Sequence, residues 1–184
     1  MRREANLLVT FDSMSYREAR AEVTDALRGV GEAHPAFLPS AVVGVFMIKI
    51  DTDPKETVRK LDALCKADPP RFQYTYHWIP IERWCPSTIE EMSGVVKEFA
   101  ERIKPDESWR MEIHKRFYRA FHTDELIEKL AQHVDRPRVD LKNPQKTIRI
   151  EIIGSEAGLS LLEPKDHLSV NKVKAEALTK AECY

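Results

Sequence analysis

The sequence predicts an α+β fold built from two mixed units, and three observations lead to this prediction. In the first half, short alternating or β-branched apolar runs are interleaved with stretches that show the apolar spacing of amphipathic helices. The second half mixes the same two patterns in a different order. Prolines interrupt the pattern between Trp78 and Ser87, where one unit gives way to the next. A length of 184 residues is enough for one domain or two small ones.

The first half predicts the order strand, helix, strand, strand, helix, strand. The strands are expected at 6–11, near 34–38, at 41–50 and at 72–78, where apolar residues alternate or cluster. Ser15-Tyr16-Arg17-Glu18 resembles a capping box and opens the first helix, which ends at Gly29. Asp53 followed by Pro54 opens the second helix. This order of elements is the βαββαβ arrangement of a ferredoxin-like domain.

The second half predicts the order helix, strand, helix, strand, strand. The first helix opens at a further capping box, Ser87-Thr88-Ile89-Glu90, and a second helix opens at Thr123. Strands are expected at 109–114, 147–153 and 157–162, the last two joined through Gly154. The domain limits that follow are 1–84, 85–165 and a polar tail, 166–184, with a short helix near 171–179. Because no Gly/Ser-rich linker separates the two domains, we expect them to pack closely.

Composition excludes several classes of protein. The chain has 11 Pro and 6 Gly, too few for a fibrous repeat, and it is 42% hydrophobic, too apolar for a disordered chain. Its three cysteines, Cys65, Cys85 and Cys183, form no CxxC pair and are too few for a disulfide scaffold. No apolar run approaches the ~20 residues of a membrane helix. We therefore expect a cytoplasmic protein with reduced thiols and no membrane partner.

The near-zero net charge hides an uneven distribution. The chain has 29 basic and 30 acidic residues, but the stretch 110–149 holds ten basic and six acidic ones. An excess of this size arises by chance about as readily as by selection for binding, so the positions of the charged residues are more informative than their number. The candidate RNA contacts in and beside this stretch are Arg110, His114, Lys115, Arg116, Arg119, Arg136, Arg138, Lys142, Asn143, Lys146 and Arg149. Such a patch suits phosphate contacts, and Phe117, Tyr118 and Phe121 beside it either stack on bases or pack in the core.

The chain shows no motif that marks catalysis. It has no phosphate-binding GxxxxGK[ST] loop, no GxGxxG, no HExxH and no GxSxG. His114 and His122 have no Cys or carboxylate at metal-ligand spacing, and Cys85 has no base that the sequence identifies. We therefore expect no cofactor, no metal and no catalytic residue.

One part of the second half resembles a known family. Val139-Asp140-Leu141-Lys142-Asn143-Pro144-Gln145, with the strands 148–153 and 158–162 that follow, closely resembles the core signature of the THUMP domain. The stretch 109–116 resembles the basic strand of that family, and 123–127 resembles its second helix. Residues 77–82, with Cys85 just after, resemble the junction between an N-terminal ferredoxin-like domain and THUMP. The resemblance covers residues 6–162.

The resemblance implies a function in tRNA modification. THUMP domains bind tRNA, usually at the acceptor stem and 3′ end, while an attached or partner enzyme modifies a distant base. We expect no room for such an enzyme after Leu162, so the chain resembles the stand-alone THUMP adaptor required for N4-acetylcytidine formation, with an RNA acetyltransferase or another tRNA-modifying enzyme as partner. The alternative is a small tRNA-modifying enzyme with a site at the domain junction, using Cys85 or a histidine there. By resemblance, Asp140, Lys142, Asn143 and Pro144 match the signature loop, and Arg110, Lys115 and Arg116 the basic strand.

The signature loop also has a direct physical interpretation. Pro144 has a fixed φ and biases Asn143 toward an extended conformation. Asp140 is placed to accept hydrogen bonds from the amides of the turn, so we interpret Asp140 and Pro144 as structural and Lys142 as the phosphate contact. Arg149 is open to two roles, RNA contact or an ion pair within the sheet.

Overall fold

The computed structural model describes residues 4–181, and they form two compact units. The first unit comprises residues 4–80 together with the chain from Lys165 onward, and the second comprises Ile81–Pro164. Both are mixed α/β structures, which confirms the predicted fold class. The expected places of Cys183 and of the last residues of the tail lie outside the described part of the chain.

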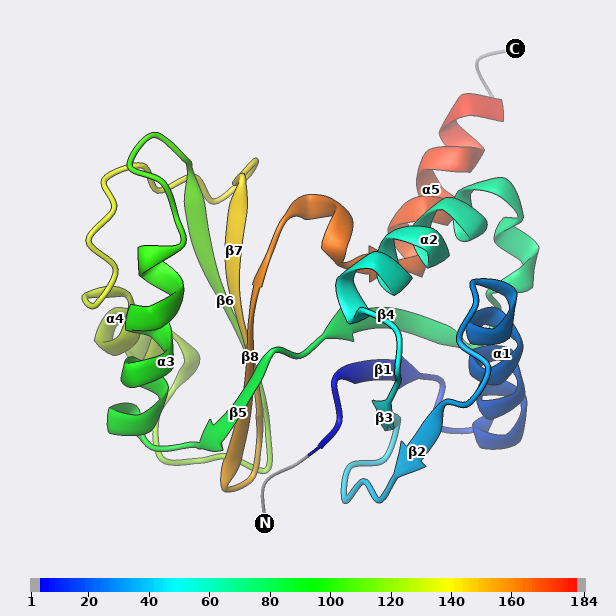
Figure 1. Cartoon of the computed structure of the whole chain (residues 1–184), viewed down its shortest axis with the longest axis horizontal. Coiled ribbons are helices and arrows are strands. Elements are labelled where there is room, and N and C mark those ends of the chain that lie inside the picture. The colour runs from blue at the N-terminus through cyan, green and yellow to red at the C-terminus, as the bar shows by residue number, and fades with distance from the viewer. Residues whose placement is uncertain (1–3, 182–184) are drawn as a thin grey trace. The chain divides into compact units, whose positions relative to one another are not determined.

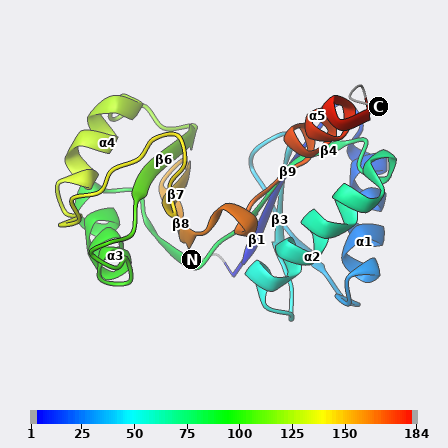
Figure 2. The same cartoon turned by 90° about the horizontal axis from the view of Figure 1, so that it is seen from above.

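The first unit is a five-stranded sheet covered on one face by helices (Figures 1 and 2). Its elements are β1 Leu7–Phe11, α1 Tyr16–Gly29, β2 Ala36–Leu38, β3 Val45–Lys49, α2 Pro54–Ala67, β4 Thr75–Pro80, β9 Leu168–Ser169 and α5 Val170–Ala181, with short 3₁₀ turns at Pro69–Arg71 and Pro164–Asp166. The strand order is β2-β3-β1-β4-β9, and every pairing is antiparallel. The core contains fully buried Leu27, Leu61, Phe72 and Trp78. The predicted βαββαβ order is therefore present.

The helix starts of the first unit follow the sequence only in part. The Asp53 carboxylate caps α2 by accepting from the Glu56 amide at 2.8 Å, as predicted. Ser15 does not cap α1 with its side chain, so the predicted capping box is wrong there. Its hydroxyl donates instead to Asp12 Oδ2 at 3.0 Å, because Asp12 organises the turn that precedes the helix.

The segment expected to be a polar tail belongs to the fold of the first unit. Leu168 lies opposite Trp78 and adds β9 to the sheet as an edge strand. Leu168, Val170 and Val173 are buried in the core of this unit. These three apolar residues stand among polar ones, and β9 contributes one of them and α5 two, so the sequence did not mark them as core residues. α5 is also longer than the helix expected near 171–179.

The second unit is a four-stranded sheet with two helices on one face (Figure 2). Its elements are β5 Arg83–Pro86, α3 Ile89–Glu101, β6 Trp109–Arg116, α4 Thr123–Ala131, β7 Lys146–Ile153 and β8 Glu156–Leu162. The strand order is β5-β8-β7-β6, with β6 and β7 parallel and the other pairs antiparallel. Residues 83–86 lie within the stretch from Trp78 to Ser87 where one unit was expected to give way to the next, and they form an edge strand of this sheet. α3 is capped by Thr88, whose hydroxyl accepts from the Glu91 amide at 3.3 Å, one residue later than the predicted box.

Candidate nucleic-acid interface

β6 carries the predicted basic strand, and its alternation separates two faces. Trp109, Met111 and Ile113 point into the core beneath α3 and α4, so Arg110 and its alternate neighbours lie on the opposite, outer face of the sheet. The outer residues of β6 are Arg110, Glu112, His114 and Arg116. Lys115 belongs to the helix side, where its ammonium donates to the Phe121 carbonyl at 2.7 Å. Lys115 is therefore occupied in holding the loop after β6.

The outer face holds a row of alternating charges that we call the ladder, formed by Arg110, Glu112, Arg149, Glu151 and Arg116. Each neighbouring pair is in direct contact. Arg110 Nη2 lies 2.5 Å from Glu112 Oε1, and Arg149 Nη1 lies 3.0 Å from Glu112 Oε2. Arg149 Nη2 lies 2.8 Å from Glu151 Oε1, and Arg116 Nη1 lies 2.6 Å from Glu151 Oε2. The parallel register places Glu112 opposite Arg149, which brings the carboxylates of one strand beside the guanidinium of the next.

The ladder decides the role of Arg149. Its side chain is 6% exposed, and Glu151 is fully buried. A buried guanidinium held by two carboxylates has no free donor face for a phosphate, so of the two roles left open for Arg149 the structure shows the ion pair. Desolvation, and then the positive charge of Arg149, lower the pKa of His114 below its ordinary value. His114 is thus neutral at pH 7 and adds no charge for an anion.

The signature loop, residues 139–145, is held by its own backbone. Asp140 Oδ1 accepts from the amides of Lys142 and Asn143, both at 2.9 Å, as the sequence predicts. These hydrogen bonds, the one from Asn143 first, hold the pKa of Asp140 below its ordinary value. Pro144 is buried, whereas Lys142 and Asn143 are exposed. The loop thus fixes its acid and its proline and presents a cation and an amide to solvent.

The ends of this loop are tied to the start of β6. The Asp140 amide donates to the Trp109 carbonyl at 3.0 Å, and the Ser108 amide donates to Gln145 Oε1 at 2.8 Å. Arg110 Nη1 also reaches across to the Leu141 carbonyl at 3.1 Å. The guanidinium of Arg110 therefore lies beside the loop as well as at the end of the ladder, and it is a member of both.

Two predicted contacts serve mainly to join backbone segments. Arg136 Nε donates to the Ile103 carbonyl at 2.5 Å, and Arg138 donates to the Asp106 carbonyl. Both bonds connect the segment after α4 to the segment between α3 and β6. Arg138 remains exposed, so it keeps an accessible charge close to the signature loop. Lys146, in contrast, has a largely buried side chain that pairs with Glu163 at 3.0 Å.

The predicted residues form two groups rather than one patch. The signature loop adjoins the Trp109 end of β6, while Phe117 and Arg119 follow its Arg116 end. Eight strand residues at ~3.3 Å each separate the two ends by roughly 20 Å. The group at the loop contains Arg110, Arg138, Lys142 and Asn143, and the group at the far end contains Arg116, Phe117 and Arg119. Sequence reasoning counted the charges correctly but did not separate the two ends.

The aromatics at the far end divide as well. Tyr118 and Phe121 pack against the core of the second unit. Phe117 is 75% exposed and has a φ of 55°, the left-handed region that a bulky side chain rarely adopts. Of the three aromatics considered above, Phe117 is the one whose ring faces solvent. Its conformation is the local feature that sequence reasoning missed.

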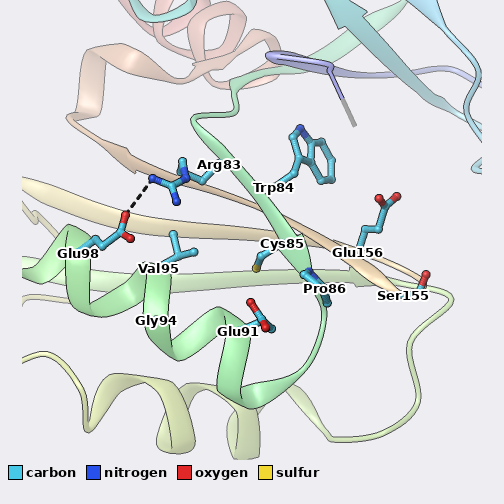
Figure 3. A pocket seen from close by; sticks show the side chains of 10 residues that line it. All are labelled: Arg83, Trp84, Cys85, Pro86, Glu91, Gly94, Val95, Glu98, Ser155 and Glu156. Atoms are coloured by element: carbon cyan, nitrogen blue, oxygen red, sulfur yellow. Dashed lines mark hydrogen bonds and ion pairs between the residues drawn. The ribbon is translucent and has the colours of Figure 1, made fainter. Parts of the chain in front are cut away.

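The thiol of Cys85 lies at a groove of about 730 Å³ between β5 and α3 (Figure 3). Burial, and then the charge of Glu91, raise the pKa of Cys85 to about 11. Arg83 at the same groove pairs with Glu98 at 3.0 Å. Since the thiolate is the reactive form, Cys85 is not an activated nucleophile at neutral pH. No histidine is among the residues that line this groove.

Among residues 4–181, no group of three His, Cys, Asp or Glu side chains has the arrangement that holds a metal ion. No helix in the same range has the length and apolar character needed to cross a membrane.

The family model of the THUMP domain matches residues 86–162. This part of the chain is therefore a THUMP domain, an RNA-binding class of domain, which confirms the predicted resemblance for residues 86–162. The match contains the ladder strands and the signature loop. No curated protein sequence matches the chain at a significant level.

Several solved structures share the fold of the chain. PH1313 from Pyrococcus horikoshii is 16% identical, with a TM-score of 0.57 over 86% of this chain and 55% of its own. TrmN from Thermus thermophilus is also 16% identical, with a TM-score of 0.55 over 86% of this chain and 46% of its own. A 4-thiouridine synthetase, solved in complex with RNA and ATP, is 11% identical, with a TM-score of 0.50 over 90% of this chain and 42% of its own. The chain thus spans about half the length of these structures, and the likeness is one of fold.

Proposed function

We propose that this THUMP-domain chain binds tRNA at the acceptor stem and 3′ end and presents it to a separate modification enzyme in the cytoplasm. The observation that carries the proposal is the THUMP domain at residues 86–162 with its signature loop folded and its polar tip exposed. The shared fold with a 4-thiouridine synthetase that was solved with RNA supports tRNA as the ligand. The partner in this proposal is an RNA acetyltransferase that forms N4-acetylcytidine, or another tRNA-modifying enzyme.

The RNA contacts in this proposal come first from the group at the signature loop. Lys142 has no ion-pair partner within residues 4–181, and the Asn143 side chain is exposed beside it. Arg138 adds a further exposed cation, and Arg110 is partly exposed at the same end of β6. These groups suit phosphate oxygens, whose contacts are electrostatic and carry little sequence information. Arg119 and Phe117 at the far end are the second place for contact.

The adaptor role is favoured over catalysis by the state of Cys85. A stand-alone enzyme with a site near the domain junction is the second candidate, because Cys85 lies at a groove large enough for a nucleoside. A thiol with a pKa of about 11 lacks the thiolate that such an enzyme needs. We also propose that the THUMP domain, expected at 85–165, folds as a unit that begins with the edge strand β5.

A mobility-shift titration tests tRNA binding. The full chain is mixed with tRNA at several salt concentrations, and in parallel with the same tRNA lacking its 3′-terminal CCA. The expected result is an affinity that falls with salt and falls again when the 3′ end is removed. Binding that is insensitive to both would contradict the proposal.

A second experiment separates adaptor from enzyme. Purified chain is incubated with unmodified tRNA and candidate group donors, and the nucleosides are analysed by mass spectrometry. The adaptor proposal expects no product unless a modification enzyme is added. Product formed by the chain alone, and lost in Cys85→Ser, would establish the enzyme instead.

A further inference from the structure

The first unit carries a surface that the proposed RNA contacts do not use, at the N-terminal half of α1. Met14 and Val43 are 91% and 82% exposed, and Tyr16 is 52% exposed. Isolated exposed apolar residues are ordinary, but Tyr16 and Val43 line one hollow of about 460 Å³, and Met14 follows Ser13, which also lines it. The exposed apolar side chains therefore surround a concave surface and are not merely scattered over a flat one.

The floor of this hollow is aromatic and rigid. Phe11 and Phe46 stack with ring centroids 4.0 Å apart, and Phe37 meets Phe46 edge to face at 5.2 Å. Tyr16 packs against Phe46 at 5.5 Å. The guanidinium of Arg20 lies 3.9 Å from the centre of the Phe37 ring. Interlocked rings of this kind keep the hollow open, since none of them can fold into it without losing its own contacts.

A second hollow of about 450 Å³ adjoins the first and shares Tyr16 and Arg20 with it. It lies along α1, where Arg17, Arg20, Thr24 and Arg28 recur at spacings of three and four residues and so form one stripe. Arg17 and Arg28 make no ion pair within the described residues. The acid beside them, Asp25, is already paired with Arg71 at 3.0 Å. The second hollow is therefore cationic.

We infer that these two hollows are a docking surface for a partner protein that presents an apolar anchor side chain followed by carboxylates. The apolar hollow takes the anchor, and the arginine stripe of α1 takes the acidic residues. Charge complementarity fixes the sign of the partner, and exposed Met, Tyr and Arg together are the composition enriched at protein–protein interfaces. Exposed aliphatic side chains such as Met14 and Val43 give nothing to a phosphate backbone, which is why the surface favours a protein over RNA.

The mode of docking is through side chains and not by adding a strand. β2 is the edge strand nearest this surface, and Figure 1 shows it at the end of its sheet. It has three residues and is flanked by Pro35 and Pro39, which have no amide hydrogen to donate. A partner strand would find few backbone groups to pair with there. The inference stands apart from the proposed RNA function, because it uses none of the residues of the THUMP domain.

Selection of short random peptides displayed on phage tests the chemistry of the partner. The bait is the full chain, compared with the double variant Met14→Ser/Val43→Ser and with the control Lys172→Glu/Leu178→Ser on the exposed side of α5. The expected result is enrichment of peptides that combine an aromatic or leucine anchor with Asp or Glu. This enrichment disappears with the first variant and persists with the control. No enrichment, a motif without acids, or enrichment that survives Met14→Ser/Val43→Ser would overturn the inference.

The strongest selected peptide is then measured by fluorescence anisotropy. Arg17→Glu/Arg28→Glu is expected to weaken peptide binding by about tenfold while leaving the affinity for tRNA unchanged. A comparable loss of tRNA affinity would make the stripe an RNA surface and overturn the inference. Light scattering measures the oligomeric state of the wild type and of Met14→Ser/Val43→Ser. A wild-type dimer that this double variant dissociates would show that a second copy of the chain occupies the surface, and would overturn the inference. Failure of tRNA binding in the wild type would affect the proposed function alone.

Discussion

The ladder and the signature loop lie in the same domain and draw on the same residue types, but they use their charges in opposite ways. In the ladder, Arg149 and Glu151 are buried and each guanidinium is matched to a carboxylate. In the loop, the acid Asp140 turns inward to the backbone amides, and Lys142 is left exposed. The ladder therefore contributes to the structure of the sheet, and the loop keeps a charge for a ligand.

This difference shows why a charge count is a poor guide to a binding site. The stretch 110–149 has an excess of basic residues, yet Arg149 and Lys146 form ion pairs with carboxylates of the same domain. The useful quantity is the charge left over after internal pairing. By that measure the signature loop and its neighbour Arg138 rank above the middle of β6.

The largest effect is expected for Glu151→Gln in the ladder. Loss of its charge removes one of the two carboxylates that pair with the buried Arg149, and it also removes the ion pair with Arg116. The free energy of unfolding should therefore fall by about 3 kcal/mol. Urea denaturation measures the change. The control is Glu98→Gln, which breaks an exposed pair with Arg83 and should cost less than about 1 kcal/mol. Equal losses for the two variants would show that the ladder is not a structural element.

A smaller effect on binding, and none on stability, is expected for Lys142→Ala. Removing one phosphate contact should weaken tRNA binding several-fold and reduce the slope of log affinity against log salt by about one unit. The matched control is Lys97→Ala, an exposed lysine on α3. Arg116→Ala, which the count alone ranks beside Lys142, should act through stability because it pairs with buried Glu151. A wild-type slope for Lys142→Ala would remove this residue from the site.

Phe117→Gly tests whether the positive φ of Phe117, just after the far end of β6, destabilises the folded chain. Glycine adopts a positive φ without the penalty of a side chain, so the free energy of unfolding should rise by up to about 1 kcal/mol. Thermal unfolding measures this change, and the tRNA affinity of the same variant is measured beside it. A fall in affinity together with the gain in stability would make Phe117 a stacking residue. A loss of stability would show that the ring is held by contacts that outweigh the strain.

The smallest effect is a pH dependence of the loop. Because the pKa of Asp140 is lowered in the folded chain, its contribution to stability is complete above the ordinary value of 3.8. It is then lost as the pH falls through the folded value. The protection factors of the Lys142 and Asn143 amides, which compare the measured exchange rate with the intrinsic rate at the same pH, should fall in that acid range. Asp140→Asn should remove this fall. Protection factors that stay constant with pH in the wild type would contradict the hydrogen bonds that Asp140 accepts.

Most of the fold could be predicted from the sequence, because alternation and helical spacing mark elements that bury one face. The exceptions share a physical cause. β9 and β5 are short edge strands, with too few residues for a period to show. The run 41–50 was expected to be one strand, but β3 begins at Val45 because Gly44, with a φ of 79°, makes a turn before it.

The site was less accessible to sequence reasoning. The hydrogen bonds of Asp140 are local, so spacing alone revealed them. The partners of Arg149 lie on its own strand and on β6, and the register that joins them is set by the whole sheet. The separation of Lys142 from Arg119 along β6 also depends on which end of the strand the loop meets. No pattern within a short window carries that information.

Photo-crosslinking tests most directly whether the signature loop contacts the acceptor end of the tRNA. A benzophenone amino acid replaces Asn143 in one sample and Lys97 in the other, and the crosslinked nucleotides are mapped on the same tRNA. Crosslinks are expected from position 143 to the acceptor stem or 3′ end, and none above background from position 97. Crosslinks from position 143 to another part of the tRNA, or equal yields from the two positions, would contradict this contact.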